Sequence, residues 1–290
     1  MNFLAVLAAL AAERFLPHGL GFGEPRLLRA LLRGLDRSRP GAALARSALL
    51  PWLLTAAAVA VTALIQYRLA GSLAGGLFGG LLLFLCLGPR DLADEVGQLL
   101  AARQRGDRPA VIRLARQLQH GPEPDDSHRS LLGALFIQSH ERLFGVLLAF
   151  LTVGPAGAVF YRLASRLPAQ VEALEPDTAA ARAAAQLHGL AAWLPVRLTA
   201  LLFALAGSMD DAMTAWRRLG ELDFRHGWRS HSWAVLAEVG CGALASEEAE
   251  GSKPVAPKLD AALREVLRMQ TRALLILLAG FAVFTTGTLF

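Results

Sequence analysis

The chain has 290 residues, of which 54% are hydrophobic and only 18% are charged, and its mean hydropathy is +0.42. This composition is too apolar for an ordinary soluble domain of that length, so we expect an all-α, polytopic membrane protein with the lipid bilayer as its main partner. The net charge is +5, but the cations lie between the apolar runs. That distribution indicates membrane topology and excludes a nucleic-acid surface.

Six apolar segments are long enough, or nearly so, to cross a bilayer. We expect one membrane domain over 1–290 with spans at 2–20, 48–70, 71–88, 144–162, 188–207 and 273–290. Most of the Lys and Arg lie in amphipathic helical regions at 21–47, 89–143 and 208–272, which the positive-inside rule places in the cytoplasm. Both termini then lie outside the cytoplasm of a bacterial inner membrane. If the first segment does not span, five spans remain and only the N-terminus changes side.

The first apolar segment ends in charged residues. Extending it to residue 20 takes Glu13, Arg14 and His18 into or near the membrane, which is costly unless these side chains face protein or water. Either Glu13 is an intramembrane functional group, or it snorkels with Arg14 from the end of a short helix. The segment has no basic region before it and no clear cleavage site after it, so we expect it to be retained.

The stretch 144–162, FGVLLAFLTVGPAGAVFYR, places Gly154, Pro155 and Gly157 in the middle of an apolar run. A proline there predicts a kinked transmembrane helix that faces protein, because neighbouring groups must satisfy the carbonyl that the proline leaves without a partner. The polar residues 138–142 immediately precede this run. We therefore expect the functional centre of the chain at this kink.

A second proline, Pro195, lies in the span 188–207 together with Arg197. Arg197 and Arg162 each need a carboxylate, phosphate or carbonyl partner inside or beside the membrane. Either they form ion pairs that fix the register of the helices, or they build a site for a small anion or a lipid headgroup. The carboxylates available for such pairs are Glu13, Asp91 and Asp210.

We predict that Arg162, Arg197 and Glu141 converge on one cavity between the two proline-containing spans. Glu141 is its weakest member, because it starts at the opposite end of its span. The candidate ligand-binding residues are Glu13, Glu141, Tyr161, Arg162, Arg197 and Asp210.

Two local patterns add detail to the fold. Gly71, Gly75 and Gly79 recur every four residues, a spacing that lets helix backbones approach closely, either within the chain or in a homo-oligomer. In the polar region that follows, Gly106 is placed to end one helix and Asp107 to cap the next, with Pro109 near its first turn. This second pattern predicts a helical hairpin.

The common signatures of soluble enzymes are absent from the sequence. There is no P-loop, dinucleotide-binding glycine motif, HExxH or CxxC pair, and the seven His are scattered. Cys86 and Cys241 indicate neither a disulfide nor a metal site. His140 and Glu141 are adjacent, so on an α-helix they point about 100° apart and cannot easily share one metal. We therefore predict no catalytic residue, metal or cofactor from motifs.

Several stretches carry a family resemblance over nearly the whole chain. They are GPRDLADEV and RGDRPAVIRLA within 88–115, ERLFGVLLAFLTVGPAGAVFYRL at 141–163, LPVRLTALLFALAGSMDDAMTAWR at 194–217, and CGAL at 241–244. Together they resemble the AmpE family of bacterial inner-membrane proteins and, through it, the wider AmpE/CobD/CbiB superfamily. The resemblance implies a regulatory or signalling role linked to β-lactamase induction and cell-wall recycling.

The CobD/CbiB branch of that superfamily attaches an aminopropanol arm to a corrinoid. Its members look like E-S-x-S-E-N followed by an Asp-Gly pair just before the span that corresponds to 144–162. Here the stretch reads FIQSHERLFG, in which no Asn follows Glu141 and residues 143–145 supply no Asp. We therefore expect a non-enzymatic regulator of the AmpE type. The alternative is a CobD/CbiB-like membrane ligase of cobalamin biosynthesis.

Overall fold

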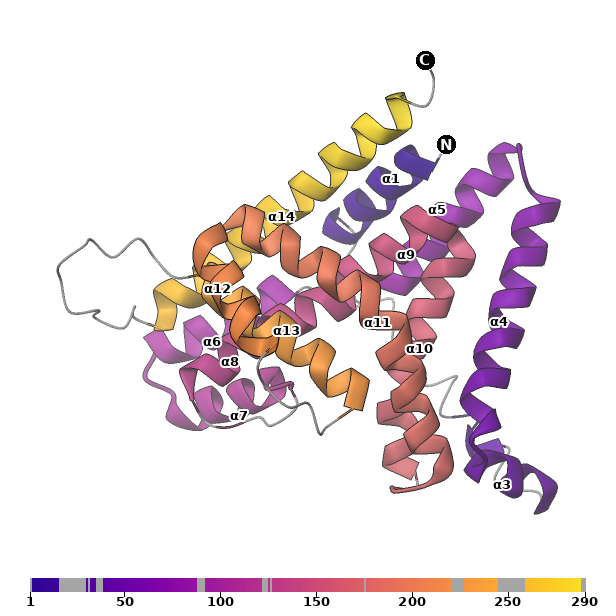
Figure 1. Cartoon of the computed structure of the whole chain (residues 1–290), viewed down its shortest axis with the longest axis horizontal. Coiled ribbons are helices and arrows are strands. Elements are labelled where there is room, and N and C mark those ends of the chain that lie inside the picture. Colours follow the sequence, from indigo (N-terminus) through magenta and orange to yellow (C-terminus); the bar gives the residue numbers. More distant parts are fainter. Residues whose placement is uncertain are drawn as a thin grey trace. The chain divides into compact units, whose positions relative to one another are not determined.

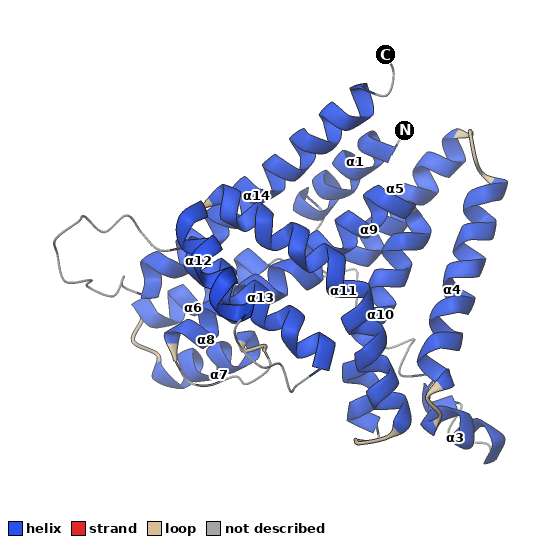
Figure 2. Cartoon of the chain, viewed as in Figure 1, coloured by secondary structure: helices blue, strands red, loops and turns tan. Residues whose placement is uncertain are grey.

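A computed structural model describes residues 2–15, 30, 32–34, 39–87, 92–121, 125, 127–174, 176–220, 227–244 and 259–287. Over these residues the chain consists of helices and short connections, without a strand (Figures 1 and 2). The helices are α1 (Asn2–Phe15), α3 (Arg39–Arg46), α4 (Leu49–Arg68), α5 (Leu73–Leu87), α6 (Leu92–Gln104), α7 (Arg108–Leu118), α8 (His128–Ser139), the π-helix η1 (His140–Phe144), α9 (Gly145–Val153), α10 (Pro155–Leu174), α11 (Ala179–Ala206), α12 (Met209–Gly220), α13 (Gly227–Ala243) and α14 (Leu259–Gly287). The expected all-α class is confirmed.

Five helical stretches of the described chain are long and apolar enough to cross a membrane, which confirms a polytopic membrane protein. Helix α4 has the exposed apolar surface expected of a lipid-facing helix. More than half of the surface of each of four large apolar side chains is exposed there: Leu49, Leu53, Val61 and Leu64. The first helix, α1, has 14 residues, fewer than the roughly 20 that a span needs. The five stretches are Leu49–Arg68, Leu73–Gln104, His128–Val153, Ala179–Ala206 and Leu259–Phe284.

The chain forms two compact units, each built from two separate stretches of sequence. Unit 1 comprises Met1–Pro89 and Gly145–Pro195, and unit 2 comprises Arg90–Phe144 and Val196–Phe290. The sequence marks one of the three boundaries, since the chain becomes polar after Pro89; the other two fall at the start of the apolar run 144–162 and directly after Pro195, inside apolar segments.

Unit 1 contains a helical hairpin in place of the single kinked helix expected over 144–162. Helix α9 ends at Val153, Gly154 adopts a φ of +79°, and α10 begins at Pro155. The two helices lie against each other: a Cβ on Gly145 of α9 would lie 2.2 Å from Cζ of Tyr161 in α10. The chain therefore reverses at Gly154, because glycine reaches positive φ without strain and proline starts the next helix.

The glycine series near residue 75 packs within this unit. Gly71 has a φ of +77° in the turn before α5. A Cβ on Gly75 would lie 2.4 Å from the carbonyl oxygen of Leu69, and Gly79 is buried with Pro155 Cγ 3.4 Å from its Cβ position. Gly79 thus allows α5 to approach the tip of the α9–α10 hairpin, so this position serves packing within the chain.

Unit 2 joins both of the long polar regions. Helices α6 and α7 form the expected hairpin: Gly106 has a φ of +70°, and the Asp107 carboxylate accepts a hydrogen bond of 3.1 Å from the backbone N–H of Ala110. Helix α13 packs against both α12 and α8, and α14 packs against α8 and α6. On the α8–α13 interface, Gly240 lies directly over the ring of Phe136.

Candidate functional site

The polar residues before α9 lie on a π-helix. The five residues of η1 continue α8 without a break, and such wider turns are frequent at functional sites because the extra residue changes which side chains face the neighbouring helices. His140 and Phe144 are buried there, and Glu141 and Arg142 are partly buried. The π-turn therefore places two charged side chains among the helices of unit 2.

Glu141 is the centre of this polar cluster. Its Oε1 accepts a hydrogen bond of 2.8 Å from Nε1–H of Trp233 in α13. Its Oε2 lies 3.3 Å from Nε2 of His120, and the side chain of Glu141 is only 16% exposed whereas that of His120 is 34% exposed. A carboxylate so placed needs these partners, since water reaches it poorly. His120 is the more exposed of the two side chains.

Two aromatic contacts complete the surroundings of Glu141. The ring centroids of His120 and Trp233 are 4.5 Å apart. The guanidinium carbon of Arg229 lies 4.2 Å from the Trp233 ring centroid, one turn earlier on α13. A cation at that distance is attracted to the ring face. The ring of Trp233 is therefore positioned by His120 and Arg229, and its N–H positions the carboxylate of Glu141.

A second network fixes the π-turn from the other side. Arg142 donates to Glu95 of α6 at 2.9 Å and also to the side-chain oxygen of Gln138. The amide nitrogen of Gln138 donates to the backbone carbonyl of Leu118, the last residue of α7. Because Leu118 is two residues before His120, this chain of contacts fixes the segment that carries His120 beside Glu141.

Arg197 also contacts α13. Its Nη2 lies 3.5 Å from Nε2 of His231, two residues from Trp233. Burial lowers the pKa of His231, and the positive charge of Arg197 lowers that pKa further. The same helix α11 contributes Thr199, whose hydroxyl lies 2.8 Å from Nδ1 of the buried His140. Helix α13 is therefore the element that both Glu141 and Arg197 contact.

Unit 1 holds the other two candidates from the fourth predicted span. Tyr161 is 1% exposed, packs on Gly145 and meets the ring of buried His188 edge-on at a centroid distance of 6.4 Å. Arg162 is the next residue of α10 and is half-buried. The shared cavity of Arg162 with Arg197 and Glu141 stays a prediction, since Arg162 belongs to unit 1 and the other two to unit 2.

The remaining candidates lie apart from these contacts. Asp210 is exposed in the first turn of α12, beside Asp211, which accepts a hydrogen bond from Ser208. Helix α1 includes Glu13, but the side chain of Glu13 falls outside the described residues, as does Asp91. Pro195 lies inside the continuous helix α11. Within the described chain, no group of three or more His, Cys, Asp or Glu is arranged to hold a metal ion.

The contacts add residues that the sequence did not single out. They are Glu95, His120, Arg229, His231 and Trp233. None stands at a spacing that links it to Glu141 or Arg197, because these residues come from α6, α13 and the connection after α7. The one available signal was the dense polar run 138–142, which marked the centre without its partners.

The fold and this cluster define a polytopic helical membrane protein with a partly buried carboxylate site. The chain belongs to the CobD/CbiB protein family, whose model matches residues 22–237. It is similar to the cobalamin biosynthesis protein CobD of Chromobacterium violaceum, with 29% identity over 78% of this chain and 72% of the relative. It is also similar to the cobalamin biosynthesis protein CobD of Stutzerimonas stutzeri, with 27% identity over 83% of this chain and 80% of the relative. No solved structure matches the chain.

These relatives correct the function expected from the sequence. An AmpE-type regulator of β-lactamase induction was the first expectation, and it is wrong: the family model and both curated relatives point to cobalamin biosynthesis. The expectation weighted the altered acid stretch at 138–145 too heavily. A changed motif shows only that some residues of a site differ from the family pattern. The family match over residues 22–237 covers most of the chain and therefore outweighs that local difference.

Proposed function

We propose that the chain is a cobalamin biosynthesis protein of a bacterial inner membrane that acts on a corrinoid. The observation that carries this proposal is the family match over residues 22–237, because that range contains the whole Glu141 cluster, including His120, Arg197 and Trp233. The curated relatives are bacterial proteins of cobalamin biosynthesis. Five membrane-crossing stretches and basic loops agree with an inner-membrane location.

The reaction that fits the CobD/CbiB resemblance is attachment of an aminopropanol arm to a corrinoid. A carboxyl group activated by ATP is attacked by the amine, the C–N bond forms, and the activated oxygen leaves with phosphate. The ammonium group must lose protons in this step, so a base within hydrogen-bond reach is needed. Glu141 suits that role because it is partly buried and lies 3.3 Å from the more exposed His120.

This chain would perform the reaction with a different set of acids from the family pattern. Arg142, and not an asparagine, follows Glu141, and residues 143–145 supply no aspartate. The carboxylates beside the π-turn are Glu141 itself and Glu95, and Glu95 is paired with Arg142. Glu95 therefore orients the turn, and Glu141 takes the proton.

The test is an assay of the purified protein in detergent with adenosylcobyric acid, ATP and aminopropanol phosphate. We expect a corrinoid product whose mass has increased by the aminopropanol phosphate arm, detected by liquid chromatography and mass spectrometry. Glu141→Gln should lose the product, whereas Glu172→Gln, a change of an exposed carboxylate on α10, should keep it. A folded wild-type protein that forms no product under these conditions would overturn the proposal.

A further inference from the structure

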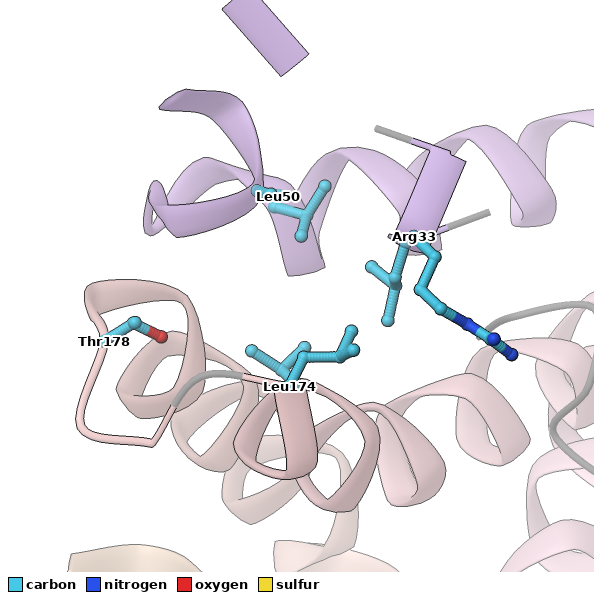
Figure 3. A pocket seen from close by; sticks show the side chains of 7 residues that line it. Arg33, Leu50, Leu174 and Thr178 are labelled. Carbon is cyan, nitrogen blue, oxygen red and sulfur yellow. The ribbon is translucent and has the colours of Figure 1, made fainter. Parts of the chain in front are cut away.

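A pocket opens in unit 1 where the end of α10, the start of α11 and the first turn of α4 meet (Figure 3). The pocket is partly open to solvent. Leu50 and Leu174 face each other across it, and Arg33 stands at its edge. Arg33 and Thr178 are the polar residues of an otherwise apolar lining.

The floor of the pocket is the hydrophobic core of unit 1. Leu32, Leu50 and Val171 are each at most 4% exposed and pack in one buried cluster with Leu167 and Leu187. Leu174 at the rim is 44% exposed. An apolar chain that enters the mouth would therefore exchange water for continuous apolar contact, which is favourable in proportion to the area covered.

The mouth lies at one end of a membrane-crossing helix. Leu50 is the second residue of α4, which crosses from Leu49 to Arg68. Trp52 follows two residues later and is 43% exposed. Exposed tryptophans near the ends of spans are typical of the membrane–water interface. The pocket is thus placed where the headgroups and upper acyl chains of lipids lie.

Among the described residues that line this pocket, the one that is charged is a cation. Arg33 is at the rim, and Arg46 ends α3, which packs against α4. The facing elements carry Glu172 and Asp177, but neither carboxylate lines the pocket. Basic pockets beside membrane spans bind anionic headgroups, because a guanidinium pairs with phosphate oxygens through two hydrogen bonds.

We propose that this pocket binds an anionic phospholipid, with the end of one acyl chain between Leu50 and Leu174 and the headgroup phosphate at Arg33. The site lies in unit 1 and contains no residue of the Glu141 cluster. It is therefore independent of the corrinoid reaction. A zwitterionic lipid offers the same acyl chain without the net negative charge, so the arginine should favour the anionic one.

Native mass spectrometry of delipidated protein titrated with phosphatidylglycerol or phosphatidylcholine tests this proposal. We expect one phosphatidylglycerol to bind more tightly than phosphatidylcholine. Arg33→Gln should weaken phosphatidylglycerol binding by about tenfold, since a charge-assisted hydrogen bond is lost, and should leave phosphatidylcholine binding nearly unchanged. Leu174→Trp should reduce binding of both lipids by filling the pocket.

Arg116→Gln, a change of an exposed arginine on α7 in unit 2, is the matched control and should bind as the wild type does. Thermal unfolding of each variant checks that the chain is folded. Equal binding of both lipids by the wild type, or wild-type binding by Arg33→Gln and Leu174→Trp, would overturn the proposal. Displacement of the lipid by millimolar inorganic phosphate would also overturn it, because the acyl chain would then contribute nothing.

Discussion

Glu141 and Trp233 are 92 residues apart in sequence and joined by a hydrogen bond of 2.8 Å between Oε1 and the indole Nε1–H. This bond connects the π-turn to α13, and it is made by a carboxylate and a donor that both have little access to water. A buried acceptor that loses its donor costs more free energy than the bond itself contributes. The pair is therefore a sensitive point of unit 2.

We expect Trp233→Phe to destabilise the protein by about 1–3 kcal/mol, because phenylalanine keeps a ring but leaves Glu141 Oε1 without its donor. Glu141→Gln should cost less in the Trp233→Phe background than in the wild type, since the two side chains interact. Denaturant unfolding of the four proteins in detergent measures this coupling. Strictly additive costs would show that the hydrogen bond contributes nothing to stability.

Gly145→Ala should disrupt the α9–α10 hairpin. Its new Cβ would lie 2.2 Å from Cζ of Tyr161, a side chain that is itself fully buried. Overpacking of this kind costs about 1–3 kcal/mol. Gly97→Ala is the matched control, because the space around Gly97 is open and alanine is the better helix former there. Thermal unfolding should show a lower midpoint for the first variant and an equal or higher one for the second.

The pKa of His231 should respond to Arg197. Burial, and then the charge of Arg197, hold this pKa below the ordinary value of 6.5. Arg197→Gln should raise it, as NMR titration of the histidine ring can measure. Because the folded pKa lies below the unfolded one, the folded state binds fewer protons, and stability decreases as pH decreases through the unfolded pKa. Arg197→Gln should make that acid-side loss smaller, and an unchanged titration would contradict the contact.

Cys241 is half-buried and should react slowly in the folded protein. Burial raises the pKa of its thiol to about 12, and the nearby charge of Arg129 only partly offsets that effect. The thiolate is the reactive form, so little of it exists at neutral pH. Maleimide should label wild-type protein slowly at pH 7.5 and quickly after denaturation. Asp125→Cys, in an exposed loop, supplies a fast-reacting control, and equal rates at both sites would disprove the burial.

The sequence predicts the fold class and several local features because hydropathy and capping act over short distances. The Asp107 cap is an example, since both partners lie within three residues. The α9–α10 reversal was not predictable in the same way. A Gly-Pro pair in an apolar run fits either a kink or a reversal, and the choice depends on the φ of Gly154 and on packing of Tyr161 against Gly145.

The candidate site was predictable only in part for the same reason. Glu141 and Arg197 stood out as charges beside or within apolar runs. Their partners His231 and Trp233 come from α13, and His120 comes from the connection after α7; no spacing in the sequence brings these segments together. A charged residue in an apolar run stands out in the sequence because placing it in a membrane costs free energy. The residues that reduce this cost by pairing with it are brought close only by tertiary packing, which the sequence pattern does not show.

The π-turn at His140–Phe144 has a consequence for the phase of the helix that contains it. Helix α8 packs its small and aromatic residues on α13 within unit 2, and α9 packs Gly145 on Tyr161 within unit 1, so the helices before and after this turn have different packing partners. Each residue of an α-helix turns the direction of its side chain by about 100°. Removing a single residue between 140 and 144 would turn the side chains after the deletion by about 100° relative to those before it and so disturb one set of contacts. The length of this turn is therefore constrained more strictly than the identity of most residues within it.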